Sequence, residues 1–188
     1  MKQIYSTLMM LTLMVAALSI TACGGDDEED YDDSEEVVFS IHIKRLDGVE
    51  DDKIEYTKSW YHEYFEVYGN ALFEKKHFII LPMVGRMYQT EIIFPNHNYE
   101  LSDFQPGFNK FGSNDVEIRH VTDCAPNSTF DGYSISGDAK VIKNDGKSVI
   151  IKFNRYKYVF ETYYNEYEVT LDGELIFWDN DWYIKNRL

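Results

Sequence analysis

From residue 37 onward, apolar and polar residues alternate with a period of two in several segments. Such alternation sends successive side chains to opposite faces of a strand, so that one face packs inward and the other meets water. The pattern is found at 37–44, 88–94, 116–120 and 166–171. Residues 77–81 are apolar on both faces, which is typical of a strand in the middle of a sheet. The chain is therefore expected to form β-strands through most of its length.

Asp-Gly pairs occur along the chain at 47–48, 131–132, 145–146 and 172–173. The last two separate apolar runs, and they predict tight hairpins because glycine accepts a positive φ without strain. Asp179-Asn180 predicts a further turn, after which 182–184 would form a terminal strand. The C-terminal half thus predicts an antiparallel meander of about five strands, with an open edge at 182–185.

The segment 59–73 supports two interpretations. Its aromatic and apolar residues fall at helical spacing, and Ser59 could cap such a helix. The set is Trp60, Tyr61, Tyr64, Phe65, Tyr68 and Leu72. The same residue types favour strands, and Gly69-Asn70 could form a hairpin between 65–67 and 72–73. We expect the strand interpretation, with an amphipathic helix across the mouth of a barrel as the alternative.

Together these patterns predict an all-β fold for residues 37–188. We expect an antiparallel meander that forms a sandwich or a lipocalin-like barrel, with one short helix as an option. Aromatic residues make up 16% of the chain, and rings together with β-branched residues suit pleated surfaces. The length fits one domain. The sequence has neither an internal linker rich in Gly, Ser and Pro nor a repeat of fixed period.

Residues 1–22 have the features of a secretory leader. Lys2 supplies a positive charge, 8–18 form an apolar run, and small residues precede Cys23. The apolar run is shorter than the roughly 20 residues that a membrane-spanning helix needs. The chain is therefore expected to be exported, with cleavage after residue 22.

The tetrapeptide Ile20-Thr21-Ala22-Cys23 resembles the lipobox of bacterial lipoproteins. In that family the cysteine is diacylated on sulfur, the leader is cut before it, and its new amino group is acylated. The resemblance implies that Cys23 is the first residue of the mature protein and that acyl chains on it hold the protein in a membrane. An ordinary secretory leader with an incidental cysteine is the alternative.

An acidic tract follows this cysteine. Residues 26–36 contain nine acidic residues and no basic one, so the stretch is expected to stay extended and solvated as a tether. The tract resembles the acidic export signal that follows the lipid cysteine in surface lipoproteins of Bacteroidetes. That resemblance implies display on the outer face of the outer membrane, with a periplasmic orientation as the alternative. The chain then divides into a leader (1–22), a lipidated cysteine with its tether (23–36) and a domain (37–188).

Charge and cysteine content narrow the range of partners. The chain has 18 basic and 33 acidic residues and a net charge of −15, which argues against nucleic acid and against anionic lipid headgroups as partners. Membrane association would therefore depend on Cys23. The other cysteine, Cys124, would have no partner and is expected to be buried rather than reactive.

No motif in the sequence indicates catalysis. There is neither a Gly-x-Ser-x-Gly motif nor a glycine-rich phosphate loop, and the many acidic residues make any single carboxylate pair uninformative. The five histidines are dispersed, and only convergence of His62-Glu63 with His120 in space would suggest a metal site. We therefore expect a protein without enzymatic activity, metal or cofactor.

Aromatic residues are the remaining candidates for a functional site. They are dense in 156–168, and Tyr and Trp combine a flat apolar surface with a polar group, which suits binding surfaces. The candidate ligand contacts are Trp178, Trp182, Tyr163 and Tyr164. Glycan capture is the favoured function, because sugars stack on such rings and surface lipoproteins often capture carbohydrate. A lipocalin-like carrier of a small apolar ligand, and a structural or adhesin-type module that binds protein by strand addition, are the alternatives.

Overall fold

The computed structural model describes residues 35–49, 51–81, 88–112, 116–122 and 128–187. Its strands are β1 (Val37–Arg45), β2 (Asp51–Thr57), β3 (Ala71–Glu74), β4 (His77–Ile80), β5 (Tyr88–Ile93), β6 (Glu117–Thr122), β7 (Ser128–Asn144), β8 (Ser148–Glu161) and β9 (Glu166–Asp179). Its helical segments are α2 (Lys58–Tyr61), η1 (His62–Val67), η2 (Leu101–Asp103), η3 (Lys110–Gly112) and α3 (Asn180–Arg187). The leader, Cys23, most of the tether and Cys124 lie outside the described residues, so the expectations for them stay predictions.

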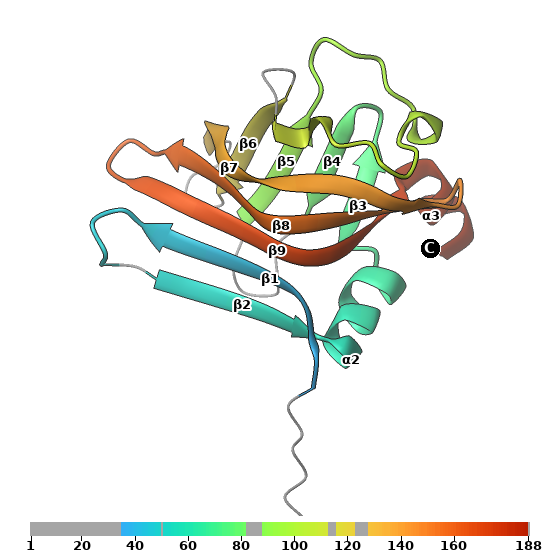
Figure 1. Cartoon of the computed structure of the whole chain (residues 1–188), viewed down its shortest axis with the longest axis horizontal. Coiled ribbons are helices and arrows are strands. Elements are labelled where there is room, and N and C mark those ends of the chain that lie inside the picture. The colour runs from blue at the N-terminus through green and yellow to red at the C-terminus, as the bar shows by residue number, and fades with distance from the viewer. Residues whose placement is uncertain (1–34, 50, 82–87, 113–115, 123–127, 188) are drawn as a thin grey trace, which may run out of the picture. The chain divides into compact units, whose positions relative to one another are not determined.

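The strands form one sheet that curls round until it meets itself (Figure 1). Strand β9 brings about this closure because it pairs along both of its edges. One edge pairs with β8 along most of its length. The other edge pairs with β1 over 167–173 and then with β3 at 178–179. Strands β9, β3, β4, β5, β6, β7 and β8 therefore form a barrel-like ring, and the β1–β2 hairpin extends the sheet from the first half of β9.

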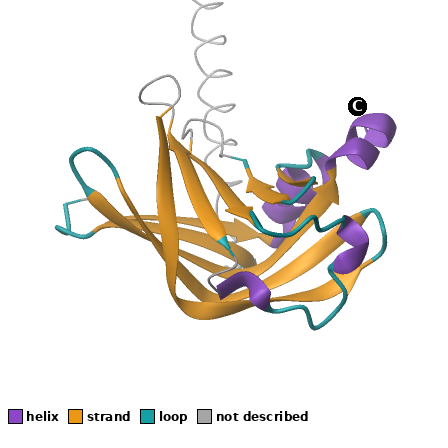
Figure 2. Ribbon diagram, turned by 90° about the horizontal axis from the view of Figure 1, so that it is seen from above, coloured by secondary structure: helices purple, strands orange, loops and turns teal. Residues whose placement is uncertain are grey.

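The all-β fold predicted from the sequence is confirmed. Each alternating segment falls on a strand, and the apolar segment 77–81 forms β4, which lies between β3 and β5 as expected of a central strand. Asp145-Gly146 turns the hairpin between β7 and β8, also as predicted. The described pairings are antiparallel apart from a short parallel contact between β3 and β9. Figure 2 shows the strands curving around a common interior.

The predicted hairpin at Asp172-Gly173 is wrong, because both residues lie inside β9. Gly173 has a φ of +105°, which here lets β9 approach β1 without reversing the chain. A Cβ on this glycine would lie 2.2 Å from the Val38 carbonyl oxygen. The Asp172 carboxylate accepts a hydrogen bond from the Arg155 amide, at 3.1 Å, where the register of β8 shifts. The Asp-Gly pair therefore acts as an irregularity within β9 and not as a turn. As a result the C-terminal meander has four strands, β6 to β9, instead of the predicted five.

The expected terminal strand at 182–184 is also wrong, because residues 180–187 form helix α3. The Asp179 carboxylate accepts a hydrogen bond from the Trp182 amide at 2.8 Å, so it caps the start of this helix. Lys185 and Arg187 lie in the last turn, where positive charge complements the helix dipole. The open edge expected at 182–185 is therefore not formed, and the outermost strand of the described sheet is β2.

Residues 58–67 are helical, so the strand interpretation of 59–73 is wrong over most of its length. Segments α2 and η1 follow each other directly, and the residue at the N-cap is Thr57 instead of Ser59. The chain enters a strand, β3, only after the turn at 69–70. Helical periodicity prevailed over strand propensity because one side of the segment packs on the core while the other meets water.

Aromatic side chains fill the interior of the ring. Phe78 lies at the centre of this packing, with five other rings at centroid distances of 4.7–6.4 Å. Those neighbours are Phe73, Phe94, Phe104, Phe111 and Phe177. Most of the pairs meet edge to face, the arrangement that the charge distribution of aromatic rings favours. Tyr156, Tyr158 and Phe160 of β8 are buried as well, so the face that they share is a core face.

A small polar cluster is enclosed among these rings. The hydroxyls of Thr90 and Tyr158 share a hydrogen bond of 2.8 Å, and His120 Nδ1 lies 3.4 Å from the Tyr158 oxygen. The His120 ring stacks on Phe160, with centroids 4.1 Å apart. Burial lowers the pKa of His120 from about 6.5 to about 3, and burial raises the pKa of Tyr158. Both side chains are therefore neutral near pH 7.

We expect His120 to make the fold less stable in mild acid. The unfolded chain protonates this histidine near pH 6.5 and the folded chain only near pH 3, so stability present above pH 6.5 is lost as the pH falls toward 3. Relative to His120→Phe, the free energy of unfolding of the wild type should fall by up to about 1.4 kcal/mol per pH unit in this range. Urea unfolding at a series of pH values measures this slope. Parallel pH profiles for the two proteins would contradict a neutral, buried His120.

Candidate binding site

The four aromatic residues predicted to contact ligand lie in two separate places. Tyr163 and Tyr164 occupy the turn between β8 and β9, and they are 85% and 91% exposed. Trp178 lies near the other end of β9, and Trp182 lies in α3. Strands β8 and β9 pair along their shared length, which puts the two pairs of residues at opposite ends of the hairpin (Figure 1). The structure therefore does not bring the four residues together on one surface.

Trp178 is buried, with only 8% of its surface exposed. Its Nε1 donates a hydrogen bond to the Phe65 carbonyl oxygen at 2.7 Å. Its ring stacks on Trp182, with centroids 5.4 Å apart, and the Arg187 guanidinium lies 5.3 Å from the ring centroid. Trp178 thus holds η1 against β9, and its place is beneath a helical segment and not on an open surface.

A row of aromatic side chains on the outer side of the domain begins in α2, continues in η1 and ends at the residue after η1. Trp60 and Tyr68 are 55% and 60% exposed, and Tyr64 between them in the sequence is half-buried. These three side chains, with Glu63 and Asn70, line an open groove of about 540 Å³. A concave, mainly aromatic surface with a few polar groups is typical of a ligand site. This groove is the candidate binding site.

The opposite side of the same segment is fixed to the core. Tyr61 and Phe65 are buried, and the Tyr61 hydroxyl accepts a hydrogen bond from the Ile176 amide at 2.8 Å. Gly69 continues this inner row and packs against α3, since a Cβ there would lie 2.4 Å from the Tyr183 ring. Strand β9 and helix α3 therefore support the groove from below, which limits movement of its aromatic side chains.

Segment η1 is a π-helix, whose turns are wider than those of an α-helix. The Tyr68 amide donates to the carbonyl oxygen of Glu63, five residues earlier, at 3.0 Å. Tyr183 Oη donates to the Val67 carbonyl oxygen at 2.6 Å, in addition to the bond that Phe65 receives from Trp178. Side chains from β9 and α3 thus satisfy carbonyl groups at the end of the helical segment. Single π-helical turns are frequent at functional sites, which adds to the case for this groove.

Glu35 lies at the start of the helical segment that carries this groove. The carboxylate of Glu35, the first described residue, accepts hydrogen bonds from the Thr57 hydroxyl at 2.6 Å, from the Ser59 hydroxyl at 2.8 Å and from the Ser59 amide. These bonds lower the pKa of Glu35, with the bond from Thr57 contributing most. Glu35 therefore caps the helical segment that carries Trp60.

Trp60, Tyr64 and Tyr68 were not among the ligand contacts predicted from the sequence, although the sequence contains a signal for them. Residues 60, 64 and 68 share a spacing of four, and residues 61 and 65 form a second aromatic row beside them. A helix on the surface of a small domain buries only one side against the core. If the segment is helical, one of the two rows must therefore face water.

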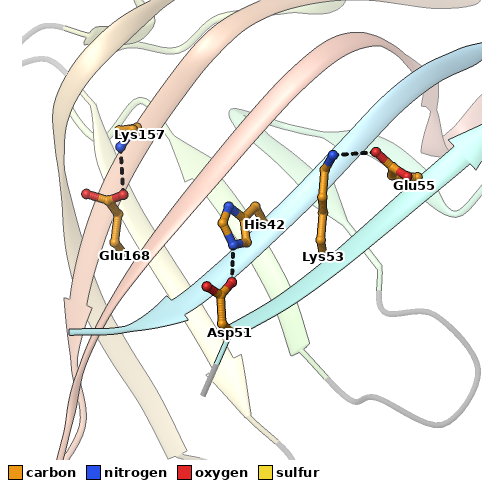
Figure 3. Close-up of polar contacts among 6 residues, drawn as sticks. All are labelled: His42, Asp51, Lys53, Glu55, Lys157 and Glu168. Atoms are coloured by element: carbon orange, nitrogen blue, oxygen red, sulfur yellow. Dashed lines mark hydrogen bonds and ion pairs between the residues drawn. The ribbon is translucent and has the colours of Figure 1, made fainter. Parts of the chain in front are cut away.

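A second candidate surface is the exposed polar face of β1, β2, β8 and β9. Figure 3 shows two ion pairs there, Lys53–Glu55 and Lys157–Glu168, and a hydrogen bond between the His42 ring and the Asp51 carboxylate. A groove of about 320 Å³ lies on the same strands and includes Lys53, Glu55, Asn154 and Asp172 in its lining. In both lysine pairs the ammonium lies beside a carboxylate, so these pairs leave little net charge to attract an ion. This face offers no concentration of one chemistry comparable with the aromatic groove.

The metal site considered from the sequence is not formed. Among the residues that the structure describes, no group of three or more His, Cys, Asp or Glu side chains could hold a metal ion. His62 lies on the exposed side of its helix, where Nδ1 is 2.6 Å from Glu66 Oε2, whereas His120 is buried against Phe160.

Comparisons of the chain with protein-family models, with curated proteins and with solved structures found no match. None of the helices in the described part of the chain has the length and apolar character needed to cross a bilayer. The function is therefore inferred from the residues and geometry of this chain.

Proposed function

We propose that this chain is a lipid-anchored protein of the cell surface that binds glycans and catalyses no reaction. The observation that carries the proposal is the row formed by Trp60, Tyr64 and Tyr68 along the groove. Large aromatic side chains gathered on one exposed surface are a feature of binding sites. Here the helical segment beneath them is bonded to β9 and α3, so their exposure belongs to the folded structure.

The groove suits a sugar ligand better than a wholly apolar one. Aromatic faces provide flat apolar area on which the C–H faces of a sugar stack. The Glu63 carboxylate and the Asn70 amide lie among the rings and can exchange hydrogen bonds with hydroxyl groups. A ligand with alternating apolar faces and hydroxyl edges uses both kinds of group at once.

The two alternative functions have less support. A carrier of an apolar ligand needs an internal cavity, whereas Phe78 and its neighbours fill the interior of the ring. Strand addition needs an open edge with few charges, and β2, the outermost described strand, carries Asp51, Lys53 and Glu55. Glycan binding at the groove requires neither feature.

The membrane anchor is part of the same proposal and has its own test. Cys23 would hold the chain in the outer membrane, with the acidic tract 26–36 as a spacer and the domain outside the cell. We expect metabolic labelling with a palmitate analogue to mark the wild type and not Cys23→Ala. Protease added to intact cells should then remove the domain. Labelling of Cys23→Ala would contradict the anchor, and protection until the outer membrane is permeabilised would place the domain in the periplasm.

Replacing Trp60 or Tyr68 by alanine is expected to weaken glycan binding at least about ten-fold, because each change removes one stacking surface. The measurement is affinity electrophoresis of the purified mature chain through gels that contain a panel of polysaccharides. Both side chains are largely exposed, so circular dichroism and the unfolding midpoint should stay near the wild-type values.

Tyr164→Ala is the matched control, because it removes an exposed ring at the other end of the β8–β9 hairpin. We expect this variant to be retarded as strongly as the wild type. Loss of retardation in Tyr164→Ala with normal retardation of Trp60→Ala would move the site to the β8–β9 turn. Free migration of the wild type through every gel would refute glycan binding.

A further inference from the structure

We infer that the groove binds an uncharged, linear polysaccharide along its length, with one sugar unit over each aromatic ring, and does not bind the end of a chain. This inference rests on the proposed function and narrows its ligand class. Two features carry it: the spacing of Trp60, Tyr64 and Tyr68 by four residues along one helical segment, and the identity of the residues that line the groove.

The π-helical turn brings the three rings toward one line. In an α-helix a spacing of four residues exceeds the turn of 3.6, so each step rotates by about 40° and a longer row winds around the helix. A π-helix closes its hydrogen bonds over five residues, so a step of four falls short of a full turn. Trp60 lies in α2, Tyr64 lies in η1, and Tyr68 follows η1 directly. The excess rotation of the α-helical part and the deficit of the π-helical part therefore oppose each other between Trp60 and Tyr68. The row of rings winds around the helix less than it would in an α-helix throughout.

The row has the length of several sugar units. At the rise of an α-helix, the distance along the axis from Trp60 to Tyr68 would be roughly 12 Å, and the wider π-helical turn shortens it, so successive rings lie at most about 6 Å apart along the axis. That spacing is close to the repeat of sugar units in an extended chain. Among the described residues, those that line the groove all belong to the continuous segment 60–70. Within the described chain, no lining residue from another element closes the ends of the groove, so a long chain can extend past the rings at both ends.

The lining also selects against charged glycans. Glu63 is the one charged residue among the lining residues of the described chain. Close by, the Glu66 carboxylate is paired with His62, and Lys58 lies near the carboxylate of Glu35. An anionic chain would meet the Glu63 carboxylate, and none of the described lining residues supplies a cation to offset the repulsion. An uncharged chain meets the same carboxylate as a hydrogen-bond acceptor for its hydroxyls.

Matched neutral and anionic polymers test the charge preference. The mature chain is run through gels that contain hydroxyethylcellulose or carboxymethylcellulose, dextran or dextran sulfate, and uncharged mannan or xylan. We expect retardation by at least one neutral polymer and none by an anionic polymer of the same backbone. Glu63→Gln should keep the retardation by the neutral polymer and lessen the discrimination against its anionic counterpart. Equal or stronger retardation of the wild type by the anionic member would overturn the preference.

Oligosaccharides of the retained backbone test binding along the chain. In isothermal titration calorimetry the affinity should rise at least about ten-fold from two sugar units to four and then level off, once every ring is covered. In Tyr68→Ala the affinity should level off at a shorter length, while the affinity for the disaccharide changes little. Affinity that does not depend on length would indicate recognition of a chain end, and it would overturn this inference while leaving glycan binding intact. Free migration of the wild type through every gel would refute both.

Discussion

Replacing Trp178 by alanine is expected to lower the free energy of unfolding by about 3–5 kcal/mol, the range for truncation of a large buried aromatic side chain. Most of the loss comes from the cavity left beneath η1, where the ring stacks on Trp182. A further part comes from the Phe65 carbonyl oxygen, which loses its donor at 2.7 Å. Urea unfolding followed by far-ultraviolet circular dichroism measures the change.

Two variants separate these contributions. Trp178→Phe keeps most of the ring and removes Nε1, so it should cost about 1–3 kcal/mol. Trp182→Ala removes a partly exposed ring that lies under the Lys147 ammonium, and it should cost less than Trp178→Ala. An unfolding midpoint of Trp178→Ala equal to that of the wild type would contradict the supporting role of this side chain.

The role of Trp178 changes how mutations at the candidate site are interpreted. The sequence pointed to Trp178 as a candidate ligand contact. In the structure this side chain supports the segment that carries Tyr64 and Tyr68, so its loss would disturb the groove indirectly. Loss of glycan retention in Trp178→Ala would therefore not identify Trp178 as a ligand contact. Trp60→Ala and Tyr68→Ala are the informative variants.

The strands were predictable from sequence because their two faces meet different surroundings. In β1 the alternation places Phe39 in the core and His42 on the exposed polar face, and the pattern records that difference directly. The hairpin at Asp145-Gly146 was predictable because the turn residues and the flanking apolar runs agree. Asp172-Gly173 offers the same local signal, but its outcome depends on β1, which lies far away in the sequence and packs across it.

The helices were harder to predict because aromatic residues favour strands when their partners are unknown. Residues 58–67 are helical because β9 and α3 supply partners for one side of the segment, such as the Ile176 amide that bonds Tyr61. Asp179 caps α3, although the same residue beside Asn180 is also a good turn former. In both places a distant or competing contact decided the local structure.

For the candidate site, the sequence predicted the types of residue but not their positions. Aromatic density correctly drew attention to Trp and Tyr, but density does not reveal which rings are exposed. Trp178 is covered because the end of β9 passes beneath η1, a contact between segments that are far apart in the sequence. Trp60 and Tyr68 are exposed because the other row of their helix, Tyr61 and Phe65, occupies the core. Spacing of four residues was the usable signal, and it requires the helix to be recognised first.

Replacing Gly173 by alanine is expected to separate β1 from β9. The residue has a φ of +105°, which an L side chain rarely adopts and which costs about 1–3 kcal/mol. Its new Cβ would also lie 2.2 Å from the Val38 carbonyl oxygen and 2.9 Å from the Phe39 Cα, so the backbone of β1 must move, at a further cost of ~1–3 kcal/mol. Amide hydrogen exchange should increase in β1 and β2, which depend on this pairing, and the unfolding midpoint should fall.

Gly146→Ala provides the control, because Gly146 has a φ of +79° in the β7–β8 turn and a Cβ there would meet nothing within 4 Å. The Gly146→Ala variant is therefore destabilised by the strained backbone conformation alone, by about 1–2 kcal/mol, and not by a steric clash. The difference between the two variants measures how closely β9 approaches β1. Since β1 connects Glu35 to the rest of the sheet, Gly173→Ala should also loosen the bonds from Thr57 and Ser59 to Glu35. Equal destabilisation by the two changes, with unaltered exchange in β1, would mean that the Asp-Gly pair in β9 acts only through its own backbone conformation.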